Sequence, residues 1–274
     1  MSHSFVALPS PAPAQPTALP AAADEAIPLL LERYGGTLYQ LGLRICGGHE
    51  EAQDMIQETF LNAYRHWDQF RGEASPKTWL YSIASRVCQR RKRLRAGQPK
   101  EMASIEDLLP GQDDAVPDVW TDDWDPFANA MSRETQEIVS RALEELPLDF
   151  RMPLVLKEIA DLSLDEIAEM LDVKPATVKT RVHRARLRLR QQLAEQLPRR
   201  DNACVRNQQI CLDLVHAKQD ALDRGVDADV PDDLICDRCE ALFATLDLTQ
   251  EACRAIGRGE LPAEVRAQVL GQFG

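Results

Sequence analysis

Cysteine and histidine side chains near the C-terminus have the types and spacing of a metal site. Cys236 and Cys239 form a Cys-x-x-Cys pair, and Cys211 and His216 lie upstream of it. Two thiolates at this spacing can chelate one Zn²⁺ ion, and a third thiolate with an imidazole would complete a tetrahedral site. The sequence therefore offers Cys211, His216, Cys236 and Cys239 as a candidate metal site, and zinc is the one cofactor that it suggests.

Three interpretations of this cysteine-containing segment stay open. It could be a metal or redox sensor that restrains the rest of the chain, and Cys236 and Cys239 would then be the pair that exchanges on oxidation. It could be a structural helical domain with buried cysteines, which are common core residues. It could also be a docking module for another protein.

Two short stretches of the chain are strongly basic although the net charge of its 274 residues is −12. Residues 86–100 hold seven Lys or Arg and no acid, and residues 177–200 hold eight against the single acid Glu195. A nucleic-acid site needs one locally basic face rather than a basic total. These stretches are candidate nucleic-acid contacts, and solvated helix faces are the alternative.

The second basic stretch has the pattern of a helix-turn-helix. Ser163 and Glu166 have capping-box spacing at a helix start, and Pro175 is placed at the first turn of the next helix. That helix carries one apolar stripe, formed by Val178, Val182, Ala185 and Leu189. Its other faces hold donors for phosphates and base edges: Lys179, Thr180, Arg181, His183, Arg184, Arg186 and Arg188. DNA binding is favoured over an ordinary amphipathic surface helix, and His183 is expected to make a surface contact.

Helical periodicity dominates elsewhere too, so an all-α fold is expected. Trp79, Leu80, Ile83, Ala84 and Val87 form one apolar stripe, which favours core packing for Trp79. Composition divides the chain into a Pro/Ala-rich tail, a helical unit, an acidic linker, a second helical unit with the helix-turn-helix, and a cysteine-containing extension. The expected bounds are 1–23, 24–97, 98–130, 131–197 and 198–274.

Several functional classes find no support. No nucleophile–base pair, phosphate loop or metal-hydrolase motif is evident, so no enzyme is expected. No apolar run approaches the length of a bilayer span, and no signal peptide is recognised, so a cytoplasmic protein without a membrane partner is expected. In that compartment the seven cysteines should be reduced, metal-bound or redox-reactive.

Two segments resemble sigma factors of bacterial RNA polymerase, in the extracytoplasmic-function group. Leu143 to Leu193 is similar to region 4, with the typical Glu-Leu-Pro at Glu145–Pro147 and Thr-Val-Lys-Thr-Arg at Thr177–Arg181. Asp54 to Arg93 is similar to region 2. The resemblance covers residues 24–195 and implies two helical sigma domains that bind core RNA polymerase and recognise the −10 and −35 promoter elements.

The resemblance also implies roles for single residues. The helix that docks on the clamp of the largest polymerase subunit is matched by Asp54, Gln57, Glu58, Phe60 and Leu61, an apolar anchor within a polar rim. Contacts with promoter DNA near the −10 element are implied for Arg86, Arg90 and Arg91. The −35 element is matched by Lys179, Thr180, Arg181, His183 and Arg184, and region 4 implies the flap of the second-largest subunit as a further partner.

The extension after residue 195 is weakly similar to the zinc-binding domain of anti-sigma factors. That domain has a His four residues before its Cys-x-x-Cys, and Asp232 stands at this position here. The resulting expectation is a sigma factor whose activity its C-terminal domain modulates, with a separate anti-sigma factor as a further partner that the resemblance allows. The alternative is a helix-turn-helix regulator that acts without core polymerase.

Overall fold

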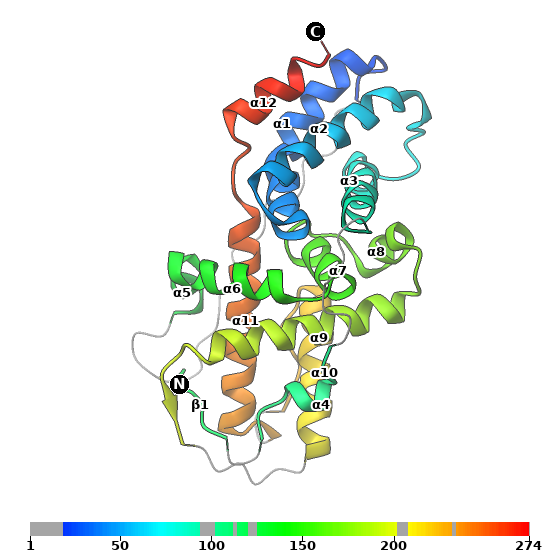
Figure 1. Cartoon of the computed structure of the whole chain (residues 1–274). Helices are drawn as coiled ribbons and strands as arrows, with labels where there is room; N and C mark the ends of the chain where they lie inside the picture. Colours follow the sequence, from blue (N-terminus) through cyan, green and yellow to red (C-terminus); the bar gives the residue numbers. More distant parts are fainter. Residues whose placement is uncertain are drawn as a thin grey trace.

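The computed structural model describes residues 19–93, 102–111, 114–119, 125–201, 208–231 and 234–273. Most of these residues are helical, which confirms the all-α expectation (Figure 1). The described strands are two short ones, β1 (Val116–Pro117) and β2 (Arg199–Arg200), which pair antiparallel. None of the described helices is long and apolar enough to span a bilayer. The predicted N-terminal tail lies largely outside the described residues.

The first helical unit is built from three long helices and two short turns. They are α1 (Ala23–Gly42), η1 (Leu43–Gly47), α2 (His49–Arg65), η2 (Trp67–Gln69) and α3 (Pro76–Arg93). Trp79 packs against Trp67 and Phe70, with ring centroids 5.7 and 5.2 Å away. Because this aromatic cluster joins α3 to the segment around η2, it confirms core packing for Trp79.

The second helical unit contains the predicted helix-turn-helix. Its helices are α5 (Pro126–Met131), α6 (Arg133–Glu145), α7 (Leu148–Glu158), α8 (Leu164–Leu171) and α9 (Pro175–Ala194). The capping box of Ser163 and Glu166 is formed, and Asp172 ends α8 in the left-handed conformation with φ 54°. The predicted apolar stripe of α9 is fully buried. Helix α9, the recognition helix of the helix-turn-helix, therefore buries the face that the sequence predicted.

The linker between these units packs on the second unit where it is described. The short helix α4 (Ile105–Leu108) lies against α9, and its Leu108 is buried beside Leu187. Further along, β1 of the linker pairs with β2, which follows α9. The described part of the acidic linker is therefore folded back onto the second unit.

The described part of the C-terminal extension contains three helices, which together contact both units. They are α10 (Gln208–Arg224), α11 (Asp237–Gly257) and α12 (Ala263–Leu270). In Figure 1, α10 and α11 both cross α9, α11 continues past α6 towards α1, and α12 lies against α1 and α2. Leu248, Ala252, Cys253 and Ile256 of α11 belong to the same core cluster as the two sigma-like units. The extension is therefore an integral part of this fold.

The two sigma-like units also touch each other directly, at α3 and α8. The Thr78 hydroxyl donates to Glu166 at 2.6 Å, and the Lys77 ammonium donates to the Asp161 carbonyl at 3.2 Å. Glu166 thus serves the cap of α8 and the contact between the units. Burial acts to raise the pKa of Glu166, but the hydrogen bonds from Thr78 and Ser163 outweigh it, so this pKa is lowered.

We predict that Glu166→Gln lowers the free energy of unfolding at pH 7 by about 1 kcal/mol, because an ionised acceptor at the cap is lost. The pKa of Glu166 is lower in the folded state, so its contribution is present above the pKa of the unfolded chain. It is lost as the pH falls through the folded-state pKa. Urea unfolding at pH 7 and in acid should show the variant and wild type converging in acid. The control is Glu169→Gln, an exposed acid of the same helix, and equal effects of the two variants would contradict the assignment.

Candidate nucleic-acid interface

The polar face of the recognition helix α9 is covered by α10. The Lys179 ammonium lies 2.8 Å from the Asp220 carboxylate, and the Gln219 side chain donates to the His183 carbonyl at 3.0 Å. Thr180 stays exposed, and its hydroxyl donates to the Ala176 carbonyl of its own helix. The face that was predicted to meet DNA is thus largely occupied by the chain itself.

His183 lies at the centre of this contact and is buried, so the prediction of a surface role is wrong for this conformation. Its side chain is 4% exposed, and its Nε2 lies 2.8 Å from Asp223 and 3.8 Å from Asp220. These three side chains are close enough to share a metal ion. However, Lys179 pairs with Asp220, and Arg186 lies 2.7 Å from Asp223. Since both carboxylates already have cationic partners, the cluster fits an ion-pair network better than a metal site.

Arg186 is the most deeply buried charge of the network. Its side chain is 2% exposed and pairs with Glu158 of α7 at 2.5 Å and with Asp223 of α10 at 2.7 Å. Burial alone would lower the pKa of Arg186, but the two carboxylates outweigh it and the pKa is raised. Burial likewise acts to raise the pKa of Asp223, yet the partners His183 and Arg186 lower it. All of these charges therefore depend on one another.

The remaining predicted contacts of α9 also have partners. The Arg181 guanidinium lies 3.6 Å from Asp149. Arg184 stacks over the Phe150 ring at 4.9 Å and donates to the carbonyls of Met102 and Ala103 in the linker. The linker and α10 thus take neighbouring parts of the same DNA-facing surface.

In the first unit, predicted DNA contacts pair with predicted polymerase contacts. The Arg91 guanidinium lies 3.0 Å from Asp54 and 3.2 Å from Glu58, and Arg90 also pairs with Glu58. Burial acts to lower the pKa of Arg91, but hydrogen bonds to the two carboxylates outweigh it and raise the pKa. Arg86 is exposed on the same helix. These surface pairs are solvent-screened, so a partner of either charge could displace them at little cost.

The predicted docking helix α2 needs one correction. Asp54, Gln57, Glu58 and Leu61 are exposed or half-buried, but Phe60 is fully buried in the core. Phe60 therefore positions α2 and is not an apolar anchor on its surface. Gln57 is already engaged, because its amide donates to Gln268 of α12 at 2.8 Å.

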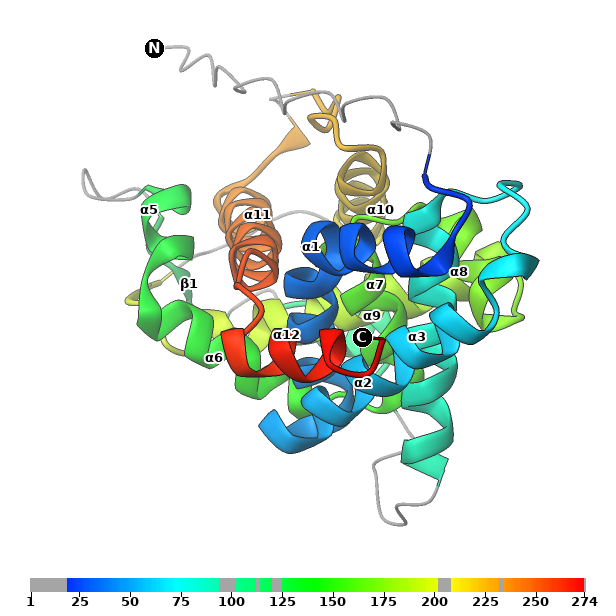
Figure 2. The same cartoon turned by 90° about the horizontal axis from the view of Figure 1, so that it is seen from above.

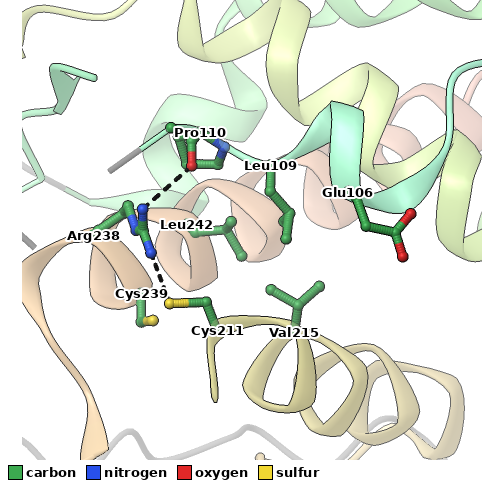
Figure 3. Close-up of a pocket in the computed structure, with 9 residues that line it drawn as sticks. Glu106, Leu109, Pro110, Cys211, Val215, Arg238, Cys239 and Leu242 are labelled. Carbon is green, nitrogen blue, oxygen red and sulfur yellow. Dashed lines mark hydrogen bonds between the residues drawn. The ribbon is translucent and has the colours of Figure 1, made fainter. Parts of the chain in front are cut away.

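The candidate metal ligands are only partly brought together. Cys211 and Cys239 line a cavity of about 180 Å³ between α10, α11 and the linker, and Figure 3 shows Arg238 beside them. The Arg238 guanidinium donates to Cys211 at 2.7 Å and to the Pro110 carbonyl at 3.4 Å, and Cys236 lies 3.9 Å from Cys239. His216 is exposed on α10. Among the described residues, these four side chains are not a group within coordination distance of one another.

Two buried thiols of the extension resist ionisation. Burial, with the neighbouring Cys236 and Cys211, raises the pKa of Cys239 to about 12. Burial raises the pKa of Cys253 as well. The zinc site is not preformed, because His216 is exposed and the four side chains do not converge within coordination distance, so the predicted zinc remains a prediction. Cys204 and Asp232 lie outside the described residues.

Sequence reasoning missed the acidic residues that cover α9. Asp220 and Asp223 stand three apart on α10, so they share one helix face. Lys179, His183 and Arg186 are spaced by four and three, which also puts them on one face. Complementary charges at matching spacing were the available signal, although nothing local says that the two faces meet.

The fold consists of two helical units, and the second unit carries a helix-turn-helix with the basic helix α9. These features define the class of DNA-binding proteins. The Sigma-70 region 2 family model matches residues 30–97, and the Sigma-70, region 4 model matches residues 136–189. The ECF RNA polymerase sigma factor SigW of Bacillus subtilis is 34% identical over 171 residues, covering 61% of this chain and 88% of the relative. The ECF RNA polymerase sigma-E factor of Escherichia coli K12 is 34% identical over 163 residues, covering 60% of this chain and 84% of the relative.

The chain therefore belongs to the extracytoplasmic-function sigma factors of the sigma-70 family. Such factors bind core RNA polymerase and promoter DNA to initiate transcription, so a regulator that acts without core polymerase is not favoured. Members of the family are initiation factors rather than a class of enzymes. Among solved structures, the sigma factor RpoE of Bartonella quintana in complex with the anti-sigma factor NepR is 24% identical, with a TM-score of 0.42, covering 60% of this chain and 94% of that one.

We predict that Asp223→Asn lowers the free energy of unfolding by about 2 kcal/mol, because the buried Arg186 guanidinium loses an ionised partner and the hydrogen bond with His183 is weakened. Urea unfolding followed by circular dichroism measures the change. The matched control is Asp213→Asn on the same helix, where the exposed carboxylate accepts a hydrogen bond from Gln209. Equal effects of the two variants would show that the network does not hold α10 in place.

Proposed function

We propose that this sigma factor is kept inactive by its own C-terminal extension, which covers the −35 recognition helix and holds the two sigma domains together. One observation carries the proposal: Lys179, His183 and Arg186 of α9 are bound by Asp220 and Asp223 of α10. In DNA complexes, basic side chains of a recognition helix meet phosphates and base edges. The carboxylates of α10 take the place of those groups.

The closed arrangement is incompatible with promoter binding for a second, geometric reason. The −10 and −35 elements are about 25 base pairs apart, which is roughly 85 Å of duplex at 3.4 Å per pair. In the structure, α3 of the first domain and α8 of the second are in hydrogen-bond contact through Thr78 and Glu166. Two domains in direct contact cannot reach both elements, so the chain must open before it initiates transcription.

The extension is well placed to prevent this opening. Helix α11 contacts α5, α6, α7 and α9 of the second domain and also α1 of the first. Its Gly257 lies against Ile159, where a Cβ would stand 2.8 Å from the Ile159 side chain. A helix packed this closely on both domains fixes their separation until it is released.

In the open state we assign the roles that the family resemblance implies. Lys179, Thr180, Arg181, His183 and Arg184 would contact the −35 element, and Arg86, Arg90 and Arg91 would contact DNA near the −10 element. Asp54, Gln57, Glu58 and Leu61 would face the polymerase clamp, with the flap of the second-largest subunit contacting the second domain. The chain would direct the polymerase's chemistry and perform none itself.

The cavity beside Cys211 and Cys239 is the part of the extension best placed to receive a signal. Arg238 joins Cys211 of α10 to Pro110 of the linker. A change at this thiol would therefore disturb both segments that cover α9, which are α10 and the linker. A metal or redox signal therefore remains a proposal, with zinc as the candidate metal. A separate anti-sigma factor would have to compete with α10 for the same face.

Run-off transcription with core polymerase tests the closed state. We expect the full-length variant Asp220→Asn/Asp223→Asn, and a chain ending at Arg200, to initiate at least about tenfold more strongly than wild type, which corresponds to ~1.4 kcal/mol of lost closure. Asp213→Asn is the control and should behave as wild type. Loss of activity on truncation would show that the extension is an activating part instead. No initiation by any form on any promoter would contradict the assigned DNA and polymerase contacts.

A further inference from the structure

Two adjacent glycines lie within the continuous helix α1, at a position where the extension crosses it. Glycine is a poor residue for a helix interior, so Gly35 and Gly36 need a structural reason. A Cβ on Gly36 would stand 2.8 Å from the Gly259 carbonyl oxygen, and one on Gly35 would stand 3.0 Å from the Leu261 side chain. The glycine pair therefore forms a notch that admits the backbone of residues 259–261.

Beyond this crossing, α12 packs on the outer side of α1 and α2, as Figure 2 shows from above. Val265 and Val269 of α12 are fully buried. The rings of Phe273 and Tyr64 are stacked, with centroids 4.8 Å apart. Apolar burial thus holds a short helix that follows only five residues after α11.

The polar contacts of α12 reach the part of α2 that is assigned to polymerase docking. Gln57 donates to Gln268 at 2.8 Å and accepts from Gln272 at 3.5 Å. Arg266 pairs with Glu32 of α1. Gln57 lies between Asp54 and Glu58 on the same face of α2, so a partner that contacts this face meets α12 first.

We propose that residues 259–273 form a latch that competes with core RNA polymerase for α2. This inference rests on the docking role that the proposed function gives to α2. The latch is a second, separate cover: α10 blocks DNA, whereas the latch blocks the polymerase. The latch is tethered to α11, and a short flexible linker gives a tethered segment an effective concentration in the millimolar range. Even weak intrinsic binding therefore keeps the latch on α2. Core polymerase can displace such a segment by mass action.

The notch gives a sharp test in the full-length protein. Gly36→Ala should strengthen α1 as a helix, because alanine is the better helix former, and should expel the latch, because its Cβ meets the Gly259 carbonyl. We expect this variant, and separately Val265→Asp/Val269→Asp, to bind core polymerase about tenfold more tightly than wild type, since a covered site is only fractionally available. Combining both changes should add nothing further.

Fluorescence titration with core polymerase measures this affinity, and a duplex −35 probe without polymerase measures DNA binding. The Asp220→Asn/Asp223→Asn variant should raise DNA affinity, whereas the latch variants should raise core affinity. Unchanged or weaker core binding by the latch variants would overturn the latch, even if the α10 variant still activates. If the Asp220→Asn/Asp223→Asn variant does not raise DNA affinity but the latch variants raise core affinity, the covering of DNA contacts by α10 is contradicted and the latch is supported.

Discussion

The closed structure depends on one buried set of charges, in which Arg186 lies between Glu158 of α7 and Asp223 of α10. Burying a guanidinium is costly unless it is paired and hydrogen-bonded, and breaking such a pair leaves an uncompensated charge. Partial detachment of α10 is therefore unfavourable: either the whole helix covers α9 or water must reach the entire network. This property favours a two-state arrangement over gradual loosening.

The carboxylates of α10 also link two properties of the recognition helix α9, namely its affinity for α10 and its affinity for DNA. Lys179 and His183 have carboxylate partners in the closed state and are assigned to DNA in the open one. A substitution on this face changes both affinities at once, and the net effect on transcription depends on which one changes more. Thr180 differs, because it is exposed and its hydroxyl donates to the Ala176 carbonyl of its own helix. The helix thus holds some positions whose contacts change on closure and others, such as Thr180, whose contacts do not.

The sequence predicted the local structure well, because caps and apolar stripes act over a few residues. The capping box at Ser163 and the buried stripe of α9 are local patterns of this kind. What covers α9 lies forty residues further along, and no local pattern pairs Asp223 with His183. The same limit explains two errors: His183 was expected on the surface, and Phe60 was expected in a docking face although it belongs to the core. The Cys-x-x-Cys spacing likewise could not show that Arg238 would stand beside Cys211.

The small strand pair between β1 and β2 has a bearing on how far the two domains can separate. Fully extended, the chain from Arg93 to Pro126 could span about 110 Å. While Val116 stays paired with Arg200, the part that could extend ends at Val116, and even with α4 detached from α9 it could span at most about 75 Å. A pairing of four residues thus sets the reach of the whole tether. Its rupture would change the spacing of promoter elements that the open protein can bridge, without altering a single side chain that reads DNA.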